Sequence, residues 1–196
     1  MKNPCPGLWL ADIQEQTKHL TSLTNNLITL SRMEEERTRL QMIDFPFSDV
    51  LEETAQSFQA LARTQNKTFE TSIQPMISLY GDEKSLTQLV SILLDNAMKY
   101  STPEGEISLR LEKAGNNVKL SVYNTADSIN REQLPRLFDR FYRTDKSRSS
   151  RTGGYGLGLS IAAAVVNTHK GKITATTQDE HSLLITVTLP LKTQGR

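Results

Sequence analysis

The chain has 196 residues, enough for one well-packed domain and an extension. Its 23 Lys and Arg residues nearly balance 22 Asp and Glu, so the net charge of +1 gives no overall bias toward nucleic acid or an acidic partner. The single cysteine, Cys5, excludes an intramolecular disulfide, and the lack of any apolar run near the roughly 18 residues of a membrane span predicts a soluble, cytoplasmic chain.

Residues 8–38 contain neither glycine nor proline, and their apolar residues follow a heptad spacing. The steps are 7, 3, 4 and 3, through Ile13, Leu20, Leu23, Leu27 and Leu30. This spacing predicts a long helix that buries one narrow stripe against a partner helix. The alternatives are a helix lying on its own domain and, favoured by the spacing, a two-helix or dimeric bundle.

The middle of the chain predicts two helices separated by two short strands. A helix at about 49–62 would be capped by Ser48 or Asp49, and strands at 67–73 and 77–82 follow it. A longer helix covers about 83–100. Its apolar face comprises Leu86, Leu89, Val90, Leu93, Leu94 and Ala97.

The remaining pattern predicts two hairpins around one more helix. Strands at 105–114 and 117–124 are joined by a glycine-containing turn. A helix at about 156–169 precedes closing strands at 171–178 and 182–191. The predicted fold class is therefore α+β: a two-layer α/β sandwich with helices on one face of a sheet, preceded by a long α-helix.

Asn96, Lys99 and Tyr100 share one side of the helix at 83–100, at positions i, i+3 and i+4. Chance alone often places such a polar trio at a helix end. The functional interpretation is that the amide oxygen of Asn96 binds Mg²⁺, which prefers hard oxygen ligands, while Lys99 meets a phosphate oxygen.

A basic stretch at 136–151, "RLFDRFYRTDKSRSSR", contains six cations and three aromatic side chains. It could bind nucleic acid, because cations neutralise phosphates and rings stack on bases. Alternatively it is a lid, with Phe138, Phe141 and Tyr142 anchoring one end in the core. Residues 143–154, which contain no large apolar side chain, would then be exposed and mobile.

The glycines of "RTGGYGLGLS", residues 151–160, favour the lid. Successive glycines let backbone N–H groups converge on an anion, and the following helix offers its positive amino end. Leu159 follows Gly158, so this is not the Gly-Lys-Ser/Thr phosphate loop, and no βαβ pattern makes it a Rossmann turn.

Taken in order, these features resemble the ATP-binding catalytic domain of bacterial sensor histidine kinases, within the GHKL group of gyrase and the MutL mismatch-repair ATPase. Residues 85–100 resemble the N box, and "VYNTADSI" at 122–129 lies where the first glycine box belongs. "LFDRFYR" at 137–143 resembles the phenylalanine box, and "GGYGLGLSIA" at 153–162 the second glycine box. The resemblance implies a GHKL/Bergerat-type sandwich with a mixed, mostly antiparallel sheet.

The resemblance also implies the division and setting of the protein. Residues 1–45 are similar to the second helix of the dimerisation and phosphotransfer domain, and residues 46–196 form the ATP-binding catalytic domain. The implied activity is that of a protein-histidine kinase using ATP and Mg²⁺, with a response regulator as partner and no nucleic acid. The full-length protein would form a homodimer through the N-terminal helix and be anchored in the inner or cell membrane.

Roles carry over position by position for the metal and the base. Asn96 would ligate Mg²⁺, with Lys99 and Tyr100 near the phosphates or sugar. Asn124 would recognise the adenine amine. Ala126 and Ser128 would let the backbone pass close to the base.

The phosphates would be held by the lid and its hinge. Arg140 and Arg143 would approach them, with Arg143 the stronger candidate for stabilising the transferred γ-phosphoryl. Phe138 belongs to the phenylalanine box beside the nucleotide. The residues lining the triphosphate would be Gly154, Gly156, Leu157, Gly158 and Leu159.

Two departures from the family pattern concern the nucleotide site. The usual aspartate of the first glycine box is Asn124, a weaker neutral acceptor, and its two glycines are Ala126 and Ser128. We expect ATP binding to survive. Ile92 stands where gyrase-like ATPases carry a glutamate that activates water, which argues against an ATP-hydrolysing machine.

The third departure is that His19, His169 and His181 all lack the flanking sequence of a phosphoacceptor. We expect the acceptor histidine to lie outside this chain. The altered first glycine box leaves open a nucleotide-binding regulatory module without kinase activity, and the stretch at 136–151 leaves open a nucleic-acid binder.

Overall fold

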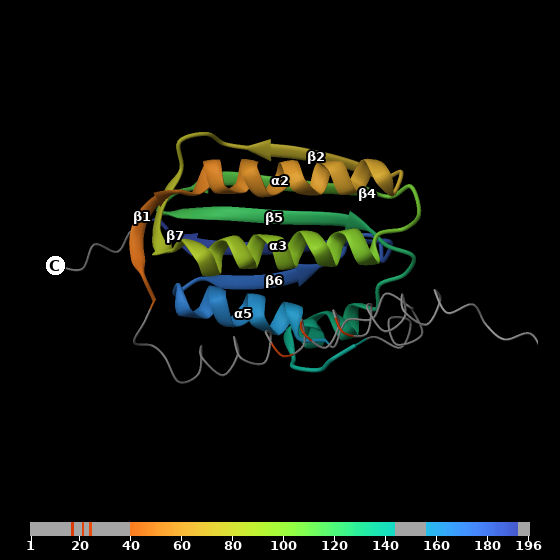
Figure 1. Cartoon of the computed structure of the whole chain (residues 1–196). Helices are drawn as coiled ribbons and strands as arrows, with labels where there is room; N and C mark the ends of the chain where they lie inside the picture. Colours follow the sequence, from red (N-terminus) through yellow and green to blue (C-terminus); the bar gives the residue numbers. More distant parts are fainter. Residues whose placement is uncertain (1–16, 18–20, 22–23, 25–39, 144–155, 192–196) are drawn as a thin grey trace, which may run out of the picture.

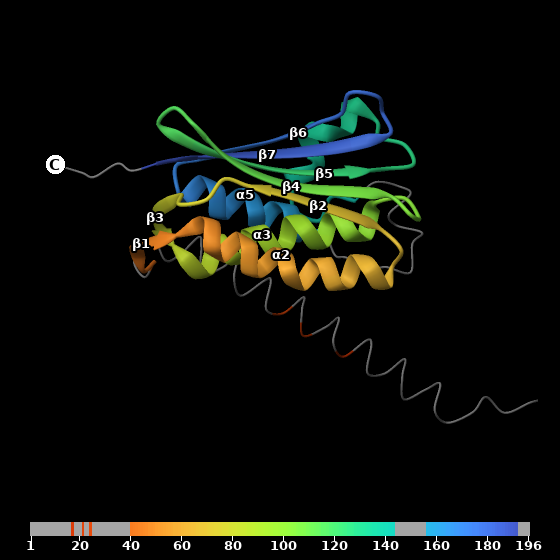
Figure 2. The ribbon, with the colours of Figure 1, turned by 90° about the horizontal axis from the view of Figure 1, so that it is seen from above.

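The computed structural model describes residues 17, 21, 24, 40–143 and 156–191. Three helices lie side by side over one face of a five-stranded sheet (Figures 1 and 2). The helices are α2 (Phe47–Thr64), α3 (Glu83–Tyr100) and α5 (Gly158–Thr168). Across the sheet the strands run β2 (Thr68–Ile73), β4 (Glu106–Ala114), β5 (Asn117–Thr125), β7 (Ser182–Pro190) and β6 (Lys172–Thr176). β2 is parallel to β4 and the other pairs are antiparallel, which confirms the predicted α+β sandwich with a mixed sheet.

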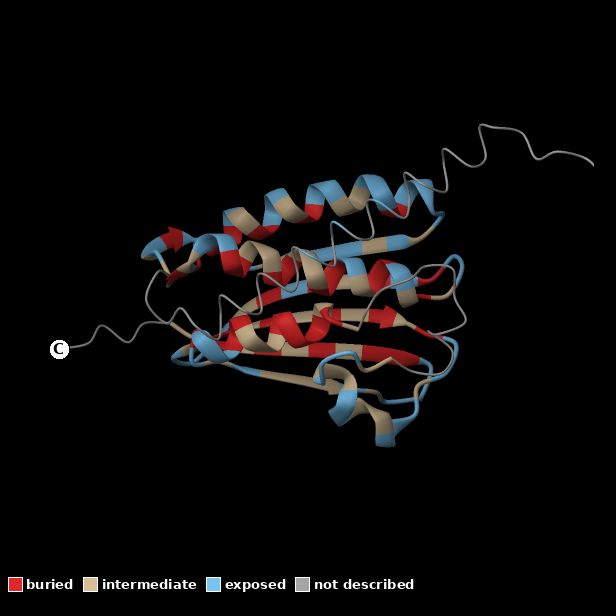
Figure 3. Ribbon diagram, turned by 60° about the horizontal axis from the view of Figure 1, so that its bottom comes forward, coloured by how far each residue is buried: buried red, intermediate tan, exposed pale blue. Residues whose placement is uncertain are grey.

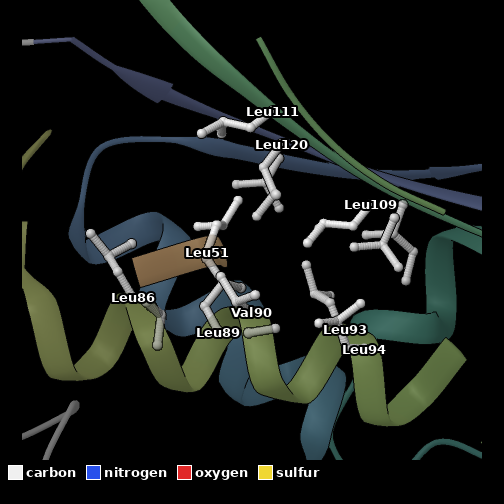
Figure 4. Close-up of a cluster of buried hydrophobic side chains, with 14 of the residues drawn as sticks. Leu51, Leu86, Leu89, Val90, Leu93, Leu94, Leu109, Leu111 and Leu120 are labelled. Atoms are coloured by element: carbon white, nitrogen blue, oxygen red, sulfur yellow. The ribbon is translucent and has the colours of Figure 1, made fainter. Parts of the chain in front are cut away.

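The core lies between the helix layer and the sheet. Leucines from α2, α3, β4 and β5 point toward one another there, among them Leu51, Leu93, Leu109 and Leu120 (Figure 4). Along β5 every second residue is buried, because only one face of the sheet is covered. Burial is concentrated in α5 and the central strands, while much of α2 is exposed (Figure 3). The leucine stripe of α3 therefore has the core role that its spacing predicts.

A strand that the sequence did not predict precedes α2. β1 (Met42–Pro46) pairs antiparallel with β3 (Ser78–Asp82) in a separate two-stranded sheet. Phe45 is buried on its inner side and packs edge-on against Phe47, with ring centroids 5.9 Å apart. Its pairing partner lies more than 30 residues away, so no local turn signals the pair.

The predicted cap of α2 is wrong. The helix begins at Phe47, its N-cap is Pro46, and no side chain caps it. Ser48 is buried instead: its hydroxyl donates to the carbonyl of Gln74 (2.7 Å) and accepts from the amide of Ile77 (3.0 Å). A long-range bond to the loop before β3 has replaced the local cap.

A 3₁₀ helix, η1 (Arg131–Phe138), was also not predicted; Pro135 lies inside it, where it provides no N–H. The helix predicted at 8–38 lies outside the described residues, except Thr17, Thr21 and Thr24, which are helical. Most of the lid predicted at 143–154 is outside them too. In the portion of the chain that is described, no helix has both the length and the apolarity to cross a membrane.

Candidate functional site

The sites predicted from the sequence meet at one end of the sandwich. The carboxyl ends of α3 and β5, the 3₁₀ helix η1 and the amino end of α5 lie there (Figure 1), and α5 packs on both α3 and η1. A Cβ added to Gly158 would lie 3.4 Å from Cγ2 of Ile92, so α5 starts against α3 about one turn before Asn96. Leu157, the N-cap of α5, provides no side-chain cap. The free N–H groups and positive dipole of this helix end can therefore receive an anion.

The three polar residues predicted near the end of α3 differ in exposure. Asn96 and Tyr100 are half-buried near the end of α3, whereas Lys99 is exposed. Nζ of Lys99 lies 2.7 Å from Oδ2 of Asp95, a surface ion pair of the i, i+4 type. Exposed pairs of this kind contribute only about 0–1 kcal/mol, so a phosphate can compete for Lys99.

Asn124 lies at the end of β5 and is 2% exposed. Its Nδ2 donates to the carbonyl of Thr125 (2.8 Å), which leaves Oδ1 as the acceptor; within the described residues Oδ1 receives no hydrogen bond. The hydroxyl of Thr125 lies 3.0 Å from that of Thr102, just beyond α3, and accepts from the amide of Glu106 (3.1 Å). The ends of α3 and β5 are thereby joined beside Asn124.

The loop after Asn124 is held by the turn between β6 and β7. The amide of Ala126, a buried residue, donates to the carbonyl of His181 (2.7 Å). Nδ1 of His181 donates in turn to the carbonyl of Asp127 (2.9 Å), which fixes the ring tautomer. Ser128 is exposed. Ala126 and Ser128, which were predicted to let the backbone pass close to the base, thus differ: Ala126 is packed and Ser128 is open.

Arg131 at the start of η1 fastens the same turn. Its Nη2 donates to the carbonyl of Gln178 (2.9 Å), and its Nε pairs with Oε1 of Glu180 (3.3 Å). The amide of Ile129 donates to the carbonyl of Glu180 (2.7 Å). Sequence reasoning missed this set of contacts, because its partners lie about 50 residues apart and no local pattern links them.

Asp179 braces the turn from within. The hydroxyl of Ser182 (2.7 Å) and the amide of His181 (2.9 Å) both donate to Oδ1 of Asp179. These two bonds hold the pKa of the Asp179 carboxyl below its ordinary value. The turn is therefore an ordered support rather than a loose connection.

The aromatic residues of the basic stretch are placed differently from what we expected. Phe138 packs partly against the core, but Phe141 is 62% exposed and has a positive φ of 60°, so its predicted anchoring is wrong. Tyr142 is half-buried beneath Arg136, whose guanidinium carbon lies 4.5 Å from the ring centroid. Arg136 also approaches Asp139 at 3.8 Å. That arginine is engaged within η1 and the residues just after it.

The two candidate phosphate-binding arginines flank this segment. Arg140 is exposed. Arg143 is half-buried and is the last described residue before 144–155, a range outside the described part that includes Gly154. The two arginines border Phe141 and Tyr142, whose backbone contacts Gly156 two residues before α5, so both are sequence neighbours of residues that lie beside the start of that helix.

Gly156 is the first described residue after 144–155. Its carbonyl accepts the amide of Phe141 (3.0 Å), and its φ is +69°. A Cβ there would lie 2.6 Å from the carbonyl oxygen of Tyr142, so only glycine fits. Leu157 and Leu159 are buried and anchor the start of α5 in the core.

Comparison with known proteins identifies relatives over most of the chain. Residues 81–193 match the family model described as histidine kinase-, DNA gyrase B-, and HSP90-like ATPase. Sensor protein DltS of Streptococcus agalactiae serotype III is 32% identical over 192 residues, which cover 97% of this chain and 48% of DltS. The chain spans about half the length of that curated relative.

Solved structures share the fold. Histidine kinase AdeS of Acinetobacter baumannii superposes with a TM-score of 0.78 at 24% identity, over 98% of this chain and 88% of that one. Histidine kinase ThkA, solved in complex with the response regulator protein TrrA, gives a TM-score of 0.77 at 22% identity, over 99% and 55% of the two chains. At these identities the likeness establishes the architecture alone.

Proposed function

This chain belongs to the family of histidine kinase-, DNA gyrase B- and HSP90-like ATPases, and on that premise we propose that it binds Mg·ATP and transfers the γ-phosphoryl group to a histidine. Its relatives over most of its length are sensor kinases, and its residues 81–193 are the ATPase domain. Residues 46–196 would be the catalytic module, and residues 1–45 a helix of the dimerisation and phosphotransfer domain.

One observation carries the proposal: the uncapped amino end of α5 starts against the half of α3 that bears Asn96. The phosphates of ATP would meet the amides at Gly156, Leu157 and Gly158, where the helix dipole favours negative charge. A Cβ at Gly156 would meet the backbone of Phe141 and Tyr142, and one at Gly158 would touch Ile92, so these two glycines let the start of α5 pack closely against its neighbours. Gly154, Arg140 and Arg143 would complete the phosphate contacts from the lid.

The residues present also suit the base and the metal. Oδ1 of Asn124 would accept the adenine amine in a buried position. No cluster of three His, Cys, Asp or Glu residues occurs in the described ranges, so Mg²⁺ would depend on Asn96, phosphate and water, as this ion commonly does. Bound there, Mg²⁺ would neutralise charge on the β- and γ-phosphates.

One residue favours transfer to histidine over hydrolysis. Ile92 cannot activate water. The acceptor would not be His169, which is buried with Nδ1 donating to the carbonyl of Val165 (2.8 Å) and Nε2 accepting the amide of Asp82 (3.0 Å). A histidine on another segment would receive the group and pass it to a response regulator, the class of partner seen with ThkA.

The test is phosphotransfer in vitro. The chain is mixed with a phosphoacceptor-bearing helical hairpin and γ-labelled Mg·ATP, and label should appear on the histidine of the hairpin. Bound nucleotide with no transferred label would favour a regulatory nucleotide-binding module instead. Salt-dependent binding of single-stranded DNA that is tighter than ATP binding would favour the nucleic-acid alternative.

A further inference from the structure

Lys67, between α2 and β2, reaches the carboxyl end of α3. Its Nζ donates to the hydroxyl of Ser101 at 2.6 Å, to the carbonyl of Met98 at 2.7 Å and to the carbonyl of Ser101 at 3.2 Å. Its own backbone is fixed by the amide, which donates to the carbonyl of Ala62 at the end of α2 (2.9 Å). A cation held by one helix thus caps another.

The chemistry of this contact matches the needs of a helix end. The last carbonyls of a helix have no partners within the helix, and its dipole is negative there. An ammonium group has three donors, and here it meets three oxygens. Burial lowers the pKa of Lys67, while the oxygens that it contacts stabilise its charged form.

The capped turn is the part of α3 that bears the candidate nucleotide contacts. Met98 and Ser101 bracket Lys99 and Tyr100, and Asn96 lies two residues before Met98. The next residue, Thr102, bonds the hydroxyl of Thr125. Lys67 therefore holds the last turn of α3, which carries the candidate nucleotide contacts and is followed at once by the link to the end of β5.

We propose that Lys67 is a positioning residue for the nucleotide: its ammonium holds the last turn of α3 so that Asn96 and Tyr100 keep their ATP-binding geometry. Lys67 acts through the backbone of α3 and makes no contact with ATP. The inference rests on the function proposed above.

The first measurement is Mg·ATP affinity by calorimetry on the full chain. Lys67→Met keeps an unbranched side chain, one atom shorter, and removes its charge. It should weaken Mg·ATP binding about tenfold, the lower range for loss of a group that orients a metal ligand. Lys67→Arg, which retains a cation, should recover most of that loss. Lys119→Met, which removes a partly exposed lysine paired with Glu112 (3.4 Å), should leave the affinity unchanged.

A second control separates positioning from general loss of stability. Val118 is fully buried near the start of β5, at the end of the strand remote from Asn124. Val118→Ala should therefore destabilise the fold without weakening Mg·ATP binding. If Val118→Ala weakens binding as much as Lys67→Met does, Lys67 acts only through stability and the proposal is wrong.

The third readout needs no nucleotide. In amide hydrogen exchange, Lys67→Met should accelerate exchange in the last turn of α3, at residues 97–101, and leave its first turns unchanged. Unchanged exchange there, or faster exchange with unchanged Mg·ATP affinity, overturns the proposal. If the wild-type chain does not bind Mg·ATP, the proposed function itself fails; if it binds and Lys67→Met binds equally well, only the role of Lys67 fails.

Discussion

The amide of Phe141 donates a 3.0 Å hydrogen bond to the carbonyl of Gly156. This bond closes the gap between the described residues on the two sides of 144–155, because it places Phe141 beside Gly156. Because α5 begins two residues after Gly156, the closure also fixes the start of the helix that would receive phosphate. Gly156 therefore lies where the proposed hinge and the proposed phosphate site would meet.

Gly156→Ala should disrupt both. A Cβ would lie 2.6 Å from the carbonyl oxygen of Tyr142 and would also strain a residue at φ +69°. We expect a loss of about 1–3 kcal/mol in the free energy of unfolding and weaker Mg·ATP binding, measured by urea denaturation and calorimetry. Gly115→Ala is the matched control, since Gly115 has a φ of +62° but nothing within 4 Å of its Cβ position. It should lose stability and keep its affinity; equal losses of affinity would remove the special role of Gly156.

Replacing Asn124 should weaken recognition of the base. Its Oδ1 is the proposed acceptor for the adenine amine, and loss of one such hydrogen bond costs about 1 kcal/mol. Asn124→Ala should therefore bind ATP roughly fivefold more weakly and should discriminate less between ATP and GTP, as measured by competition. Asn117→Ala, at the other end of β5, should retain the wild-type preference. Unchanged ATP-to-GTP selectivity in Asn124→Ala would exclude this position from base recognition.

The turn between β6 and β7 should matter for nucleotide binding although it is remote in sequence. His181→Ala removes the bond from Nδ1 to the carbonyl of Asp127 and loosens the loop after Asn124. We expect Mg·ATP affinity to fall by about threefold to tenfold, the equivalent of one hydrogen bond. Lys172→Ala, an exposed position at the start of β6, is the control. If both variants bind like the wild type, the loop does not need this support.

The N-cap of α3 should make stability depend on pH. Burial raises the pKa of the Asp82 carboxyl, but hydrogen bonds from Ser85 and from the amide of Gln41 outweigh it, so the pKa is lowered. The folded chain therefore binds this proton less tightly than the unfolded chain. The stabilisation is present above the unfolded pKa of about 3.9 and is lost as the pH falls through the folded value.

Asp82→Ala should accordingly lower the free energy of unfolding by about 1 kcal/mol at pH 7. The difference from wild type should shrink as the pH falls below about 4. Urea denaturation at pH 7 and pH 3 measures it. A difference that stays constant between the two pH values would mean that the charge of Asp82 contributes nothing.

Local patterns predicted the elements whose causes are local. The bounds predicted for α3 match its leucine stripe and its Asp82 cap, and the hairpin strands β4 and β5 follow their alternating side chains. What the sequence missed depends on distant partners: Ser48 bonds the loop before β3, and Lys67 caps a helix more than 30 residues away. No spacing rule connects such residues before the fold brings them together.

The basic stretch shows the same limit. Its composition predicted aromatic anchors, yet Phe141 is exposed, because the bond from its amide to Gly156 holds it in a left-handed conformation. Arg136 stacks on Tyr142, which charge counting could not foresee. Composition indicated a cationic lid but not which cations are already engaged.

We propose above that the chain binds Mg·ATP with Asn96 as the protein ligand of the metal. Calorimetric titration with Mg·ATP compares the wild-type chain, Asn96→Ala and the control Thr87→Ala. The control removes a hydroxyl nearer the start of α3, which donates to the carbonyl of Glu83 (2.8 Å). We expect the wild type and Thr87→Ala to bind equally and Asn96→Ala to bind at least about tenfold more weakly, with most of the difference lost when Mg²⁺ is chelated. Equal affinities of the wild type and Asn96→Ala for Mg·ATP would contradict it.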